Sequence, residues 1–350
     1  MTELIRVLVG YQVDADYGGS QHTTAREVLV RLDPTRFHVT AFYDDAPDER
    51  LIHRPNTRLV RLPERRKSVV QLRHLLARRY DRLFYWPPMP ATYTYLRLRP
   101  RRNRLVTSVE GQLWHPAFDQ ISGSSRRQAY ALLERSQRCT AVSHDVAEAY
   151  AERFDRPMPS VATLGVDTAR YRVDDGCEAR EPLVLFAGNL QRWKRPELVV
   201  EAAARFPDHR FVLAGRGPLE PLLRQQVAQS GLRNVELVGY CSFDELRALY
   251  RRASVFLFPS ISEGMPKVLL EAAASGLPIV TCGDYRPEAV RHGETGYATA
   301  DAEDMFAALG LLLGDDALRG RMSAAAVAGS CAFDWDEVVP AWAEAIAAPF

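Results

Sequence analysis

Short apolar runs alternate with helical patterns throughout the second half of the chain, and this rhythm restricts the possible folds more than any other feature. Each run is bounded by residues that start or stop helices. Strict alternation of strand and helix requires a parallel sheet with helices on both faces. The sequence therefore predicts an α/β fold. The expected strands are residues 183–187, 211–214, 235–238, 255–258 and 278–281.

The first half follows the same rhythm less regularly, so the 350 residues are expected to form two α/β domains. We expect a first domain over residues 1–168 and a second over residues 169–333. A C-terminal helix within 334–350 is expected to pack back towards the first domain. The strands expected in the first half are residues 6–9, 39–42, 83–85, 105–109 and 141–142.

The formal net charge of +1 hides an uneven distribution of charge. Residues 1–170 hold 27 basic and 19 acidic side chains, whereas residues 171–350 are net acidic. The segment 61–104 is the extreme, with 13 basic residues against Glu64 and Asp81. Such a cluster suits contact with an anionic membrane or a phosphorylated acceptor, although arginines on solvated helix faces give the same pattern. No nucleic-acid-binding module is recognisable, so nucleic acid is not an expected partner.

The five cysteines point to a reducing compartment. Their number is odd and no CxxC pair occurs, which disfavours both a disulfide framework and a structural zinc site. The N-terminal residues lack the basic start of a signal peptide, and no apolar stretch reaches the roughly 18 residues of a membrane span. We therefore expect a cytoplasmic protein, peripheral at most to the inner face of the membrane.

Two glutamates eight residues apart, Glu263 and Glu271, flank the start of an expected helix at 266–274. Gly264 lets a ligand approach the backbone, and the helix N-terminus presents N–H groups suited to a phosphate. Glu271 lies more than a turn inside the helix on an apolar face. Its carboxylate costs free energy there unless it is hydrogen-bonded, for instance to ribose hydroxyls. The plainer interpretation is that one glutamate stands at a helix start and the other extends its carboxylate from the apolar face to solvent.

This segment resembles the EX7E motif of retaining GT-B glycosyltransferases, particularly family GT4. The resemblance implies two Rossmann-like parallel-sheet domains that face each other across a cleft, with the active site in that cleft. Other segments similar to the family follow in the expected order. They are Gly18-Gly19, residues 165–167 with Tyr171, residues 185–190 with Lys194, residues 214–218, residues 276–280, and Glu288 with residues 293–296.

The resemblance also implies roles for individual residues. Lys194 is implied as a ligand of the donor diphosphate and Glu271 as a ligand of the nucleotide ribose. Glu263 and the backbone amides that follow it are implied to hold the donor sugar. The catalytic set is Lys194, Glu263 and Glu110. The donor-binding set is Gly18, Gly19, Asn189, Arg192, Gly215, Gly217, Gly264, Met265, Pro266, Lys267 and Glu271.

Three positions depart from the family pattern. Asn189 stands where many members have an arginine, so Arg192 or Arg195 is the candidate to supply the missing charge. Glu110 stands where the family often has a histidine, with His115 as an alternative.

The third departure is Asp284-Tyr285, which replaces the usual Gly-Gly and is expected to alter sugar selectivity. Residues 14–16 and 334–336 form the DxD strings that metal-dependent GT-A enzymes use, but they stand too early and too late in the chain. No metal site is predicted.

The predicted activity is transfer of a sugar from a nucleotide-diphosphate sugar to a hydroxyl acceptor, with retention and without metal or other cofactor. A UDP-linked donor is expected, and the acceptor is a lipid-linked intermediate, a polysaccharide or a secondary metabolite. Lys194 and the helix N-terminus stabilise the diphosphate as it leaves. The alternatives are a GT-B-fold nucleotide-sugar epimerase or phosphorylase, and a non-catalytic nucleotide-sugar-binding partner subunit.

Overall fold

The computed structural model describes residues 4–15, 19–77, 79–85, 87–99, 104–112, 114–116, 123–136, 138–172 and 180–349. The chain divides into two compact units. The first unit comprises Met1–Leu113, Asp119–Leu164 and Trp335–Phe350, and the second comprises Trp114–Phe118 and Gly165–Asp334.

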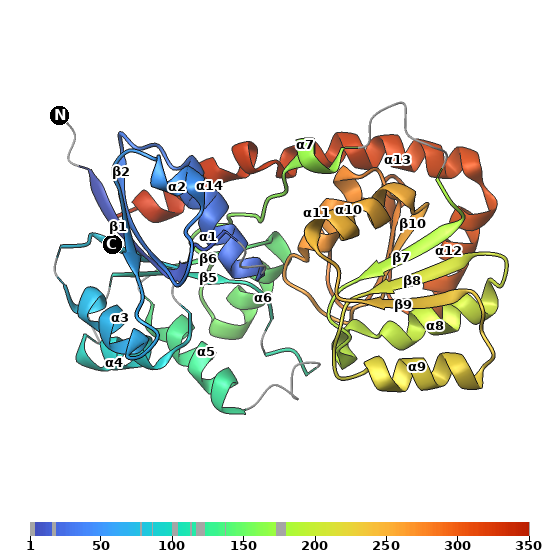
Figure 1. The fold of residues 1–350 in the computed structure, drawn as a ribbon, viewed down its shortest axis with the longest axis horizontal. Coiled ribbons are helices and arrows are strands. Elements are labelled where there is room, and N and C mark those ends of the chain that lie inside the picture. The colour runs from blue at the N-terminus through green and yellow to red at the C-terminus, as the bar shows by residue number, and fades with distance from the viewer. Residues whose placement is uncertain are drawn as a thin grey trace. The chain divides into compact units, whose positions relative to one another are not determined.

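The first unit is built on a six-stranded parallel sheet in the order β3-β2-β1-β4-β5-β6 (Figure 1). Its strands are β1 (Ile5–Gln12), β2 (Phe37–Tyr43), β3 (Thr57–Arg61), β4 (Arg82–Phe84), β5 (Leu105–Val109) and β6 (Arg138–Ala141). Its helices are α1 (Ser20–Arg31), α2 (Glu49–Ile52), α3 (Lys67–Leu76), α4 (Pro90–Leu98), α5 (Gly123–Arg135), α6 (His144–Phe154) and α14 (Trp335–Ala347).

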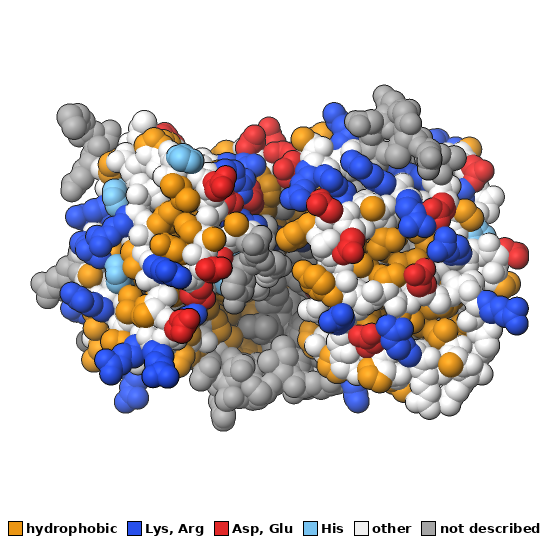
Figure 2. All heavy atoms as spheres, viewed as in Figure 1, with side chains coloured by type: hydrophobic (Ala, Val, Ile, Leu, Met, Phe, Trp, Pro, Cys, Tyr) orange, Lys and Arg blue, Asp and Glu red, His pale blue; other side chains and the backbone are white. Residues whose placement is uncertain are grey.

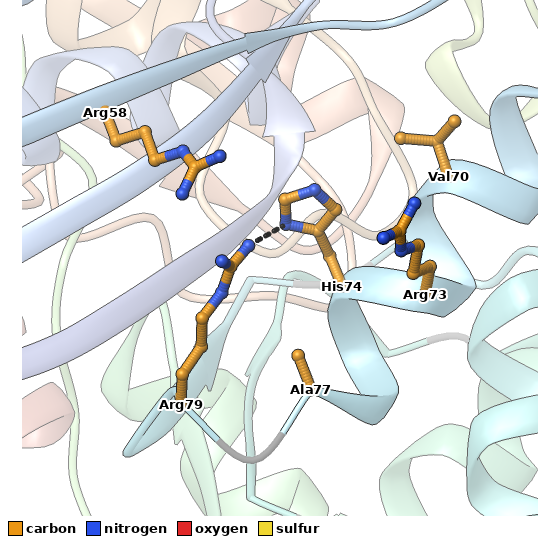
Figure 3. A pocket seen from close by; sticks show the side chains of 6 residues that line it. All are labelled: Arg58, Val70, Arg73, His74, Ala77 and Arg79. Carbon is orange, nitrogen blue, oxygen red and sulfur yellow. Dashed lines mark hydrogen bonds between the residues drawn. The ribbon is translucent and has the colours of Figure 1, made fainter.

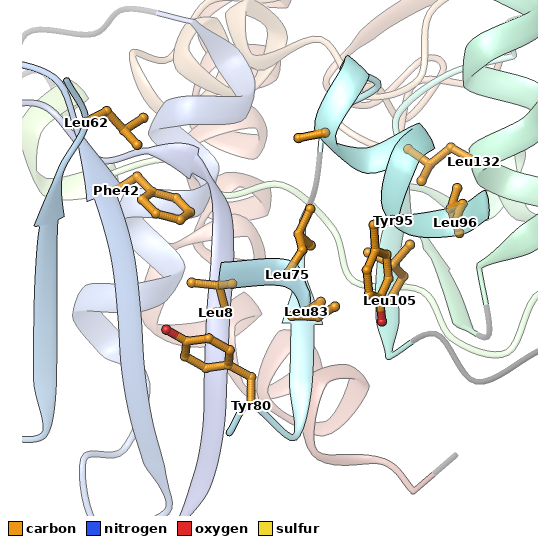
Figure 4. Close-up of a cluster of buried hydrophobic side chains, with 11 residues drawn as sticks. Leu8, Phe42, Leu62, Leu75, Tyr80, Leu83, Tyr95, Leu96, Leu105 and Leu132 are labelled. Carbon is orange, nitrogen blue, oxygen red and sulfur yellow. The ribbon is translucent and has the colours of Figure 1, made fainter. Parts of the chain in front are cut away.

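One part of the core of the first unit lies between the sheet and the helices α3, α4 and α5. Leu8, Leu83 and Leu105 project from three neighbouring strands and meet side chains of these helices (Figure 4). The sequences of these strands are mostly apolar because a parallel sheet that is covered on both faces buries nearly every side chain.

The last helix of the chain, α14, belongs to the first unit and packs against α1. Trp342 is fully buried, and its indole Nε1 donates a hydrogen bond to the carbonyl of Thr163 at 2.8 Å. Its ring also lies edge-on to Phe84 and Tyr85. One aromatic side chain thus joins the end of the chain to the end of β4.

The second unit repeats the same topology, with strands in the order β12-β11-β10-β7-β8-β9. Its strands are β7 (Leu183–Ala187), β8 (Arg210–Ala214), β9 (Val235–Gly239), β10 (Val255–Phe258), β11 (Ile279–Cys282) and β12 (Gly296–Thr299). Its helices are α7 (Thr168–Tyr171), α8 (Pro196–Arg205), α9 (Glu220–Gln229), α10 (Phe243–Arg252), α11 (Lys267–Ala274), α12 (Ala302–Gly314) and α13 (Asp316–Ser330). Two 3-10 turns are η2 (Arg192–Lys194) and η3 (Cys331–Phe333).

The α/β prediction, with two parallel sheets, is confirmed. A capping box opens α10, since the Ser242 Oγ accepts from the Glu245 N–H and the Glu245 carboxylate accepts from the Ser242 N–H. The edge strands β3 and β12 were not expected from the sequence. Both are largely half-exposed and lack a continuous apolar run, because an edge strand buries only part of its surface. No helix in the described ranges has the length and hydropathy to cross a bilayer.

Candidate functional site

The loops after β7 and β10 meet at the centre of the second sheet. The chain passes from β7 to β8 and β9 on one side, then returns to β10, β11 and β12 on the other. In open parallel sheets, ligands bind beyond the carboxyl ends of the strands at such a reversal. Lys194 lies in the loop after β7 and Glu263 in the loop after β10. The two residues with the strongest predicted roles therefore flank the expected ligand position.

Lys194 and Glu263 form an ion pair, with 2.6 Å between Nζ and Oε1. Each side chain is only 14% exposed, so the pair is weakly screened by solvent. The Ser260 hydroxyl also donates to Oε1 at 2.6 Å, and the Lys194 ammonium lies 4.8 Å from the centre of the Phe258 ring. Within the part of the chain that the structure describes, Oε2 of Glu263 has no protein partner. That oxygen is available to a hydroxyl of a bound molecule.

The backbone holds the two loops together. The Ile261 N–H donates to the Trp193 carbonyl at 2.7 Å, which ties the residue before Lys194 to the loop that carries Glu263. Positions on both sides of the ion pair are thereby fixed before any ligand binds. Preorganised charges cost little reorganisation when charge develops on a substrate.

The loop after β8 approaches the loop after β7 at van der Waals contact. A Cβ on Gly215 would lie 1.9 Å from the Gly188 carbonyl oxygen, and a Cβ on Gly217 would lie 2.4 Å from that of Leu190. Gly215 also has a φ of +145°, which L side chains rarely adopt. These glycines are explained by close packing of the two loops, which shapes the edge of the site. Their predicted contact with the donor stays a prediction.

The segment 264–267 lies directly after Glu263 and leads into α11. Gly264 and Met265 are buried, while Pro266 and Lys267 are half-buried. The N-cap residue of α11, Pro266, has no side-chain group to cap the helix, and the first turn holds no acidic residue. This helix end therefore keeps the positive electrostatic potential that favours an anion.

Glu271 is half-buried within α11 and contacts two tyrosines. The Tyr250 hydroxyl donates to its Oε2 at 3.1 Å, and Tyr171 lies close enough to the same carboxylate to favour its charged form. Desolvation raises the pKa of Glu271, although both tyrosines oppose the shift. Burial also raises the pKa of Tyr171 and Tyr250, with the Glu271 charge adding to the shift, so both hydroxyls stay protonated as donors. The carboxylate is held in one place at a cost in free energy, as expected of a group kept for binding.

The arginines after β7 have different environments. Arg195 has a left-handed φ of 46°, and its guanidinium donates to the carbonyls of Pro259 and Cys282 at 2.6 and 2.5 Å. It therefore ties the ends of β10 and β11 together. Arg192 and Asn189 are exposed, and Arg192 has no protein partner among the described residues. Of the two candidates to replace the missing charge, Arg192 is the one free to contact a ligand.

Asp284 and His115 lie together in the second unit, with 3.5 Å between Nε2 and Oδ2. The Asp284 N–H donates to the Ile261 carbonyl at 2.7 Å, which packs this departure from the family pattern against the Glu263 loop. The Asp284 backbone is therefore fixed beside the Glu263 loop, and its expected effect on sugar selectivity stays a prediction.

Glu110 lies in the first unit, directly after β5. Its charge adds to the effect of burial in raising the pKa of Tyr11 at the end of β1. The Tyr11 ring is 5.0 Å from the rings of both His22 and Tyr85. An acid and three aromatic rings thus gather at the carboxyl edge of the first sheet. Tyr11 and His22 were not singled out from the sequence, and Tyr85 only as the end of an expected strand, because the three rings come from separate elements.

The first-strand glycines are only partly described. Gly19 stands at the N-cap of α1, where it has extended backbone, and Gly18 lies outside the described residues. A Cβ on Gly19 would lie 3.1 Å from Cδ2 of His22. Space for a side chain is therefore limited at this helix start.

Three aspartates of the DxD strings bind protein groups, and the fourth, Asp16, lies outside the described residues. Asp14 accepts from the N–H groups of Asp44 and Asp45. Asp334 accepts from Thr168, and Asp336 pairs with Arg31. Across the described ranges, no group of three or more His, Cys, Asp or Glu side chains is arranged to hold a metal ion.

The fold is that of the GT-B glycosyltransferases. The chain superimposes on Alr3699/HepE of Anabaena, which was solved with UDP and glucose, with a TM-score of 0.77. The two sequences are 16% identical, and the superposition covers 99% of this chain and 100% of that chain. Sucrose-phosphate synthase from Thermosynechococcus elongatus gives a TM-score of 0.76 at 22% identity, over 97% of both chains.

Residues 181–315 of the second unit match the family model "Glycosyl transferases group 1". A D-inositol 3-phosphate glycosyltransferase of Xylanimonas cellulosilytica is 33% identical over 199 residues, which are 54% of this chain and 47% of that protein. A glycogen synthase of Mycobacterium tuberculosis is 30% identical over 244 residues, 64% of this chain and 58% of that protein. The chain thus spans about half the length of these curated relatives.

The close approach of the two glycine loops generates a stability prediction. Gly215→Ala forces a Cβ into the Gly188 carbonyl, and we expect it to lower stability by about 1–3 kcal/mol, as overpacking does. Gly320→Ala is the matched control, since Gly320 lies within α13 with open space around its Cα. That change should raise stability by up to about 1 kcal/mol, because alanine favours helix over glycine. Denaturant unfolding of both variants checks this, and a neutral Gly215→Ala contradicts it.

Proposed function

We propose that this chain is a glycosyltransferase that moves a sugar from a nucleotide-diphosphate sugar to a hydroxyl group of an acceptor. The observation that carries the proposal is the Lys194–Glu263 ion pair, which lies at the reversal point of the second sheet. The match of residues 181–315 to a glycosyltransferase family model supports it. The relatives that overlap this region are named as glycosyltransferases or glycogen synthases.

A UDP-linked sugar is the proposed donor. Alr3699/HepE, which shares the fold, was solved with UDP-glucose and with UDP and glucose. In this chain, the ribose of the donor would bind Glu271 at one end of the segment 263–271. The diphosphate would lie near Lys194, which pairs with Glu263 at the other end of that segment. The uncapped N-terminus of α11 lies between these two positions.

The proposed mechanism retains the anomeric configuration of the donor sugar, as do the family GT4 enzymes whose EX7E motif the segment 263–271 resembles. The bond between the anomeric carbon and the diphosphate oxygen breaks, and the acceptor oxygen bonds to that carbon on the same face. The acceptor proton passes to the departing phosphate oxygen. Negative charge grows on the diphosphate during this step, and Lys194 with the N-terminus of α11 stabilises it.

Glu263 has two proposed roles. Its bonded oxygen Oε1 holds Lys194 in place, and its other oxygen accepts a hydrogen bond from a donor-sugar hydroxyl. Arg192 is proposed to supply the charge that Asn189 does not. Since two cations and a helix end offset the diphosphate charge, the proposed reaction needs no metal ion or other cofactor.

The proposed setting is the cytoplasm. Its support is that Cys139, Cys241, Cys282 and Cys331 are all unpaired thiols. Contact of the basic segment 61–104 with the anionic inner face of a membrane is part of the same proposal.

Turnover of donors tests the function directly. Incubation with a panel of UDP-sugars and acceptors in excess EDTA should release UDP only when the correct acceptor is present. The product should keep the anomeric configuration of the donor, measured by NMR. Interconversion of the sugar without acceptor would instead indicate an epimerase, and donor binding without turnover would indicate a binding subunit.

Lys194→Ala should reduce kcat at least 100-fold, which is about 2.7 kcal/mol of transition-state stabilisation. The reason is that the ammonium faces charge that develops as the diphosphate leaves. Arg233→Ala is the control, because Arg233 is an exposed cation of the same unit without a protein partner among the described residues. A kcat for Lys194→Ala within about threefold of the parent, roughly 0.7 kcal/mol, overturns the assigned role.

Glu271→Gln should weaken UDP binding roughly tenfold to hundredfold, since bonds to a charged acceptor contribute about 1.5–3 kcal/mol. It should not lower thermal stability. The folded-state pKa of Glu271 lies above its unfolded value, so its contribution to stability is present in acid and is lost as pH rises through that pKa. The melting temperature of Glu271→Gln relative to the parent should therefore increase from acid to neutral pH.

Glu245→Gln is the matched control for this pH dependence. The hydrogen bonds from Ser242 lower the pKa of Glu245, so its stabilising effect is present above the unfolded pKa and lost as pH falls. Its variant should lose stability at neutral pH, with the opposite pH trend. Equal trends for the two variants would contradict the assigned environment of Glu271.

A further inference from the structure

A cavity of about 490 Å³ in the first unit is lined by Arg58, Val70, Arg73, His74, Ala77 and Arg79 (Figure 3). Half of these residues are arginines. Lys and Arg side chains are also frequent on the surface around α3 and α4 (Figure 2). None of the described residues that line the cavity is acidic. Its electrostatic potential is therefore strongly positive.

The three arginines of this cavity carry uncompensated charge. Within the described ranges, none of Arg58, Arg73 and Arg79 forms an ion pair with a carboxylate. Other arginines of the same unit are paired, as Arg6 is with Asp81 and Arg50 is with Glu27 and Asp48. Three guanidiniums brought to one cavity without an acid repel one another, and an anion between them relieves that repulsion.

His74 provides a neutral group at the same place. Its ring lies 5.3 Å from that of Phe42, and its Nδ1 lies 2.8 Å from the Tyr80 hydroxyl and 3.3 Å from Arg79. An arginine can only donate, so Nδ1 is the acceptor and the ring proton is on Nε2. Burial, and then the charges of Arg79, Arg58 and Arg73, lower the pKa of His74 to about 4.

The cavity lies at the amino end of the first sheet. Arg58 is the second residue of β3, Arg79 precedes β4, and Arg73 and His74 are in the last turn of α3. Glu110 and its aromatic neighbours lie at the opposite, carboxyl end. The C-terminus of α3 contributes a partial negative charge of about half a unit, which three full positive charges outweigh.

We propose that this cavity is a second binding site, which takes a phosphate group carried on a small organic body. Arginine forks match phosphate oxygens with paired hydrogen bonds, and the His74 Nε2–H adds a neutral donor. The side chains of Val70 and Ala77 give one wall an apolar surface for the carbon atoms next to the phosphate. The volume is within the range of small-molecule sites and exceeds the need of a bare phosphate ion. The group belongs either to a soluble phosphorylated molecule or to a phospholipid head group.

The test compares two double variants with equal loss of charge. Arg58→Gln with Arg73→Gln removes two cations from the cavity. Arg36→Gln with Arg153→Gln removes two exposed cations of the same unit that neither line the cavity nor belong to the segment 61–104. The probes are inorganic phosphate, glycerol 3-phosphate, and vesicles of phosphatidylglycerol against phosphatidylcholine. The readouts are calorimetry, vesicle flotation and the NMR titration of His74.

We expect saturable binding of glycerol 3-phosphate or phosphatidylglycerol to the parent and to the control variant. Binding should raise the pKa of His74, since an anion offsets the three arginines. The cavity variant should bind at least tenfold more weakly, and its His74 pKa should lie closer to the ordinary value without any ligand. If the double variant is unstable, the single variant Arg73→Gln should change the binding and the His74 pKa in the same directions.

The arms of the test distinguish the two sources. A His74 response to glycerol 3-phosphate identifies a soluble ligand, and a response only to phosphatidylglycerol vesicles identifies a lipid head group. The proposal is overturned if no probe shifts His74, or if the control variant loses as much binding as the cavity variant. Lys194 lies in the other unit, so this failure would leave the proposed transferase activity untouched.

Discussion

The hydrogen bond between the Ile261 N–H and the Trp193 carbonyl joins the two loops on which the proposed chemistry depends. These loops follow adjacent strands, β7 and β10, which are far apart in sequence. The chain reverses its direction of travel across the sheet between them. That reversal leaves room beyond the strand ends, and the bond fixes the backbone beside Lys194 and Glu263. The Arg195 guanidinium and the Ser260 hydroxyl add two more bonds between these loops, to the Pro259 and Trp193 carbonyls, so the ion pair does not order the loops alone.

Several parts of the second unit lower the stability of the fold but hold the site in a preorganised geometry. Glu271 is kept in a place that disfavours its charge, and the glycine-rich loops after β7 and β8 tolerate no side chain at Gly215. Arg195 and the continuous apolar strands compensate, since they tie the loops and bury the sheet. The site is thus held by a well-packed sheet and by hydrogen bonds between its loops.

Much of the architecture was predictable because it depends on local patterns. The strands at 183–187, 255–258 and 105–109 were expected at the bounds that the structure shows, since fully buried parallel strands have unbroken apolar runs. The edge strands β3 and β12 escaped because they are half-exposed. Tyr250 escaped because its partner Glu271 lies 21 residues away, on another helix. The meeting of Arg58 and Arg79 in one cavity could not be predicted for the same reason, since they come from separate elements.

The alternation of strands and helices, the division into two α/β halves and the spacing of Glu263 and Glu271 can all be read from the order of the amino acids. These features follow from hydrophobic periodicity and from the reach of a single helix, which are local properties. Which charges meet depends on how the chain folds. The tertiary structure paired Lys194 with Glu263, directed Arg195 to backbone carbonyls, and left three arginines around His74 without an acid. The reason is that electrostatic partners are set by distance in space, and strand order brings together residues that the sequence keeps apart.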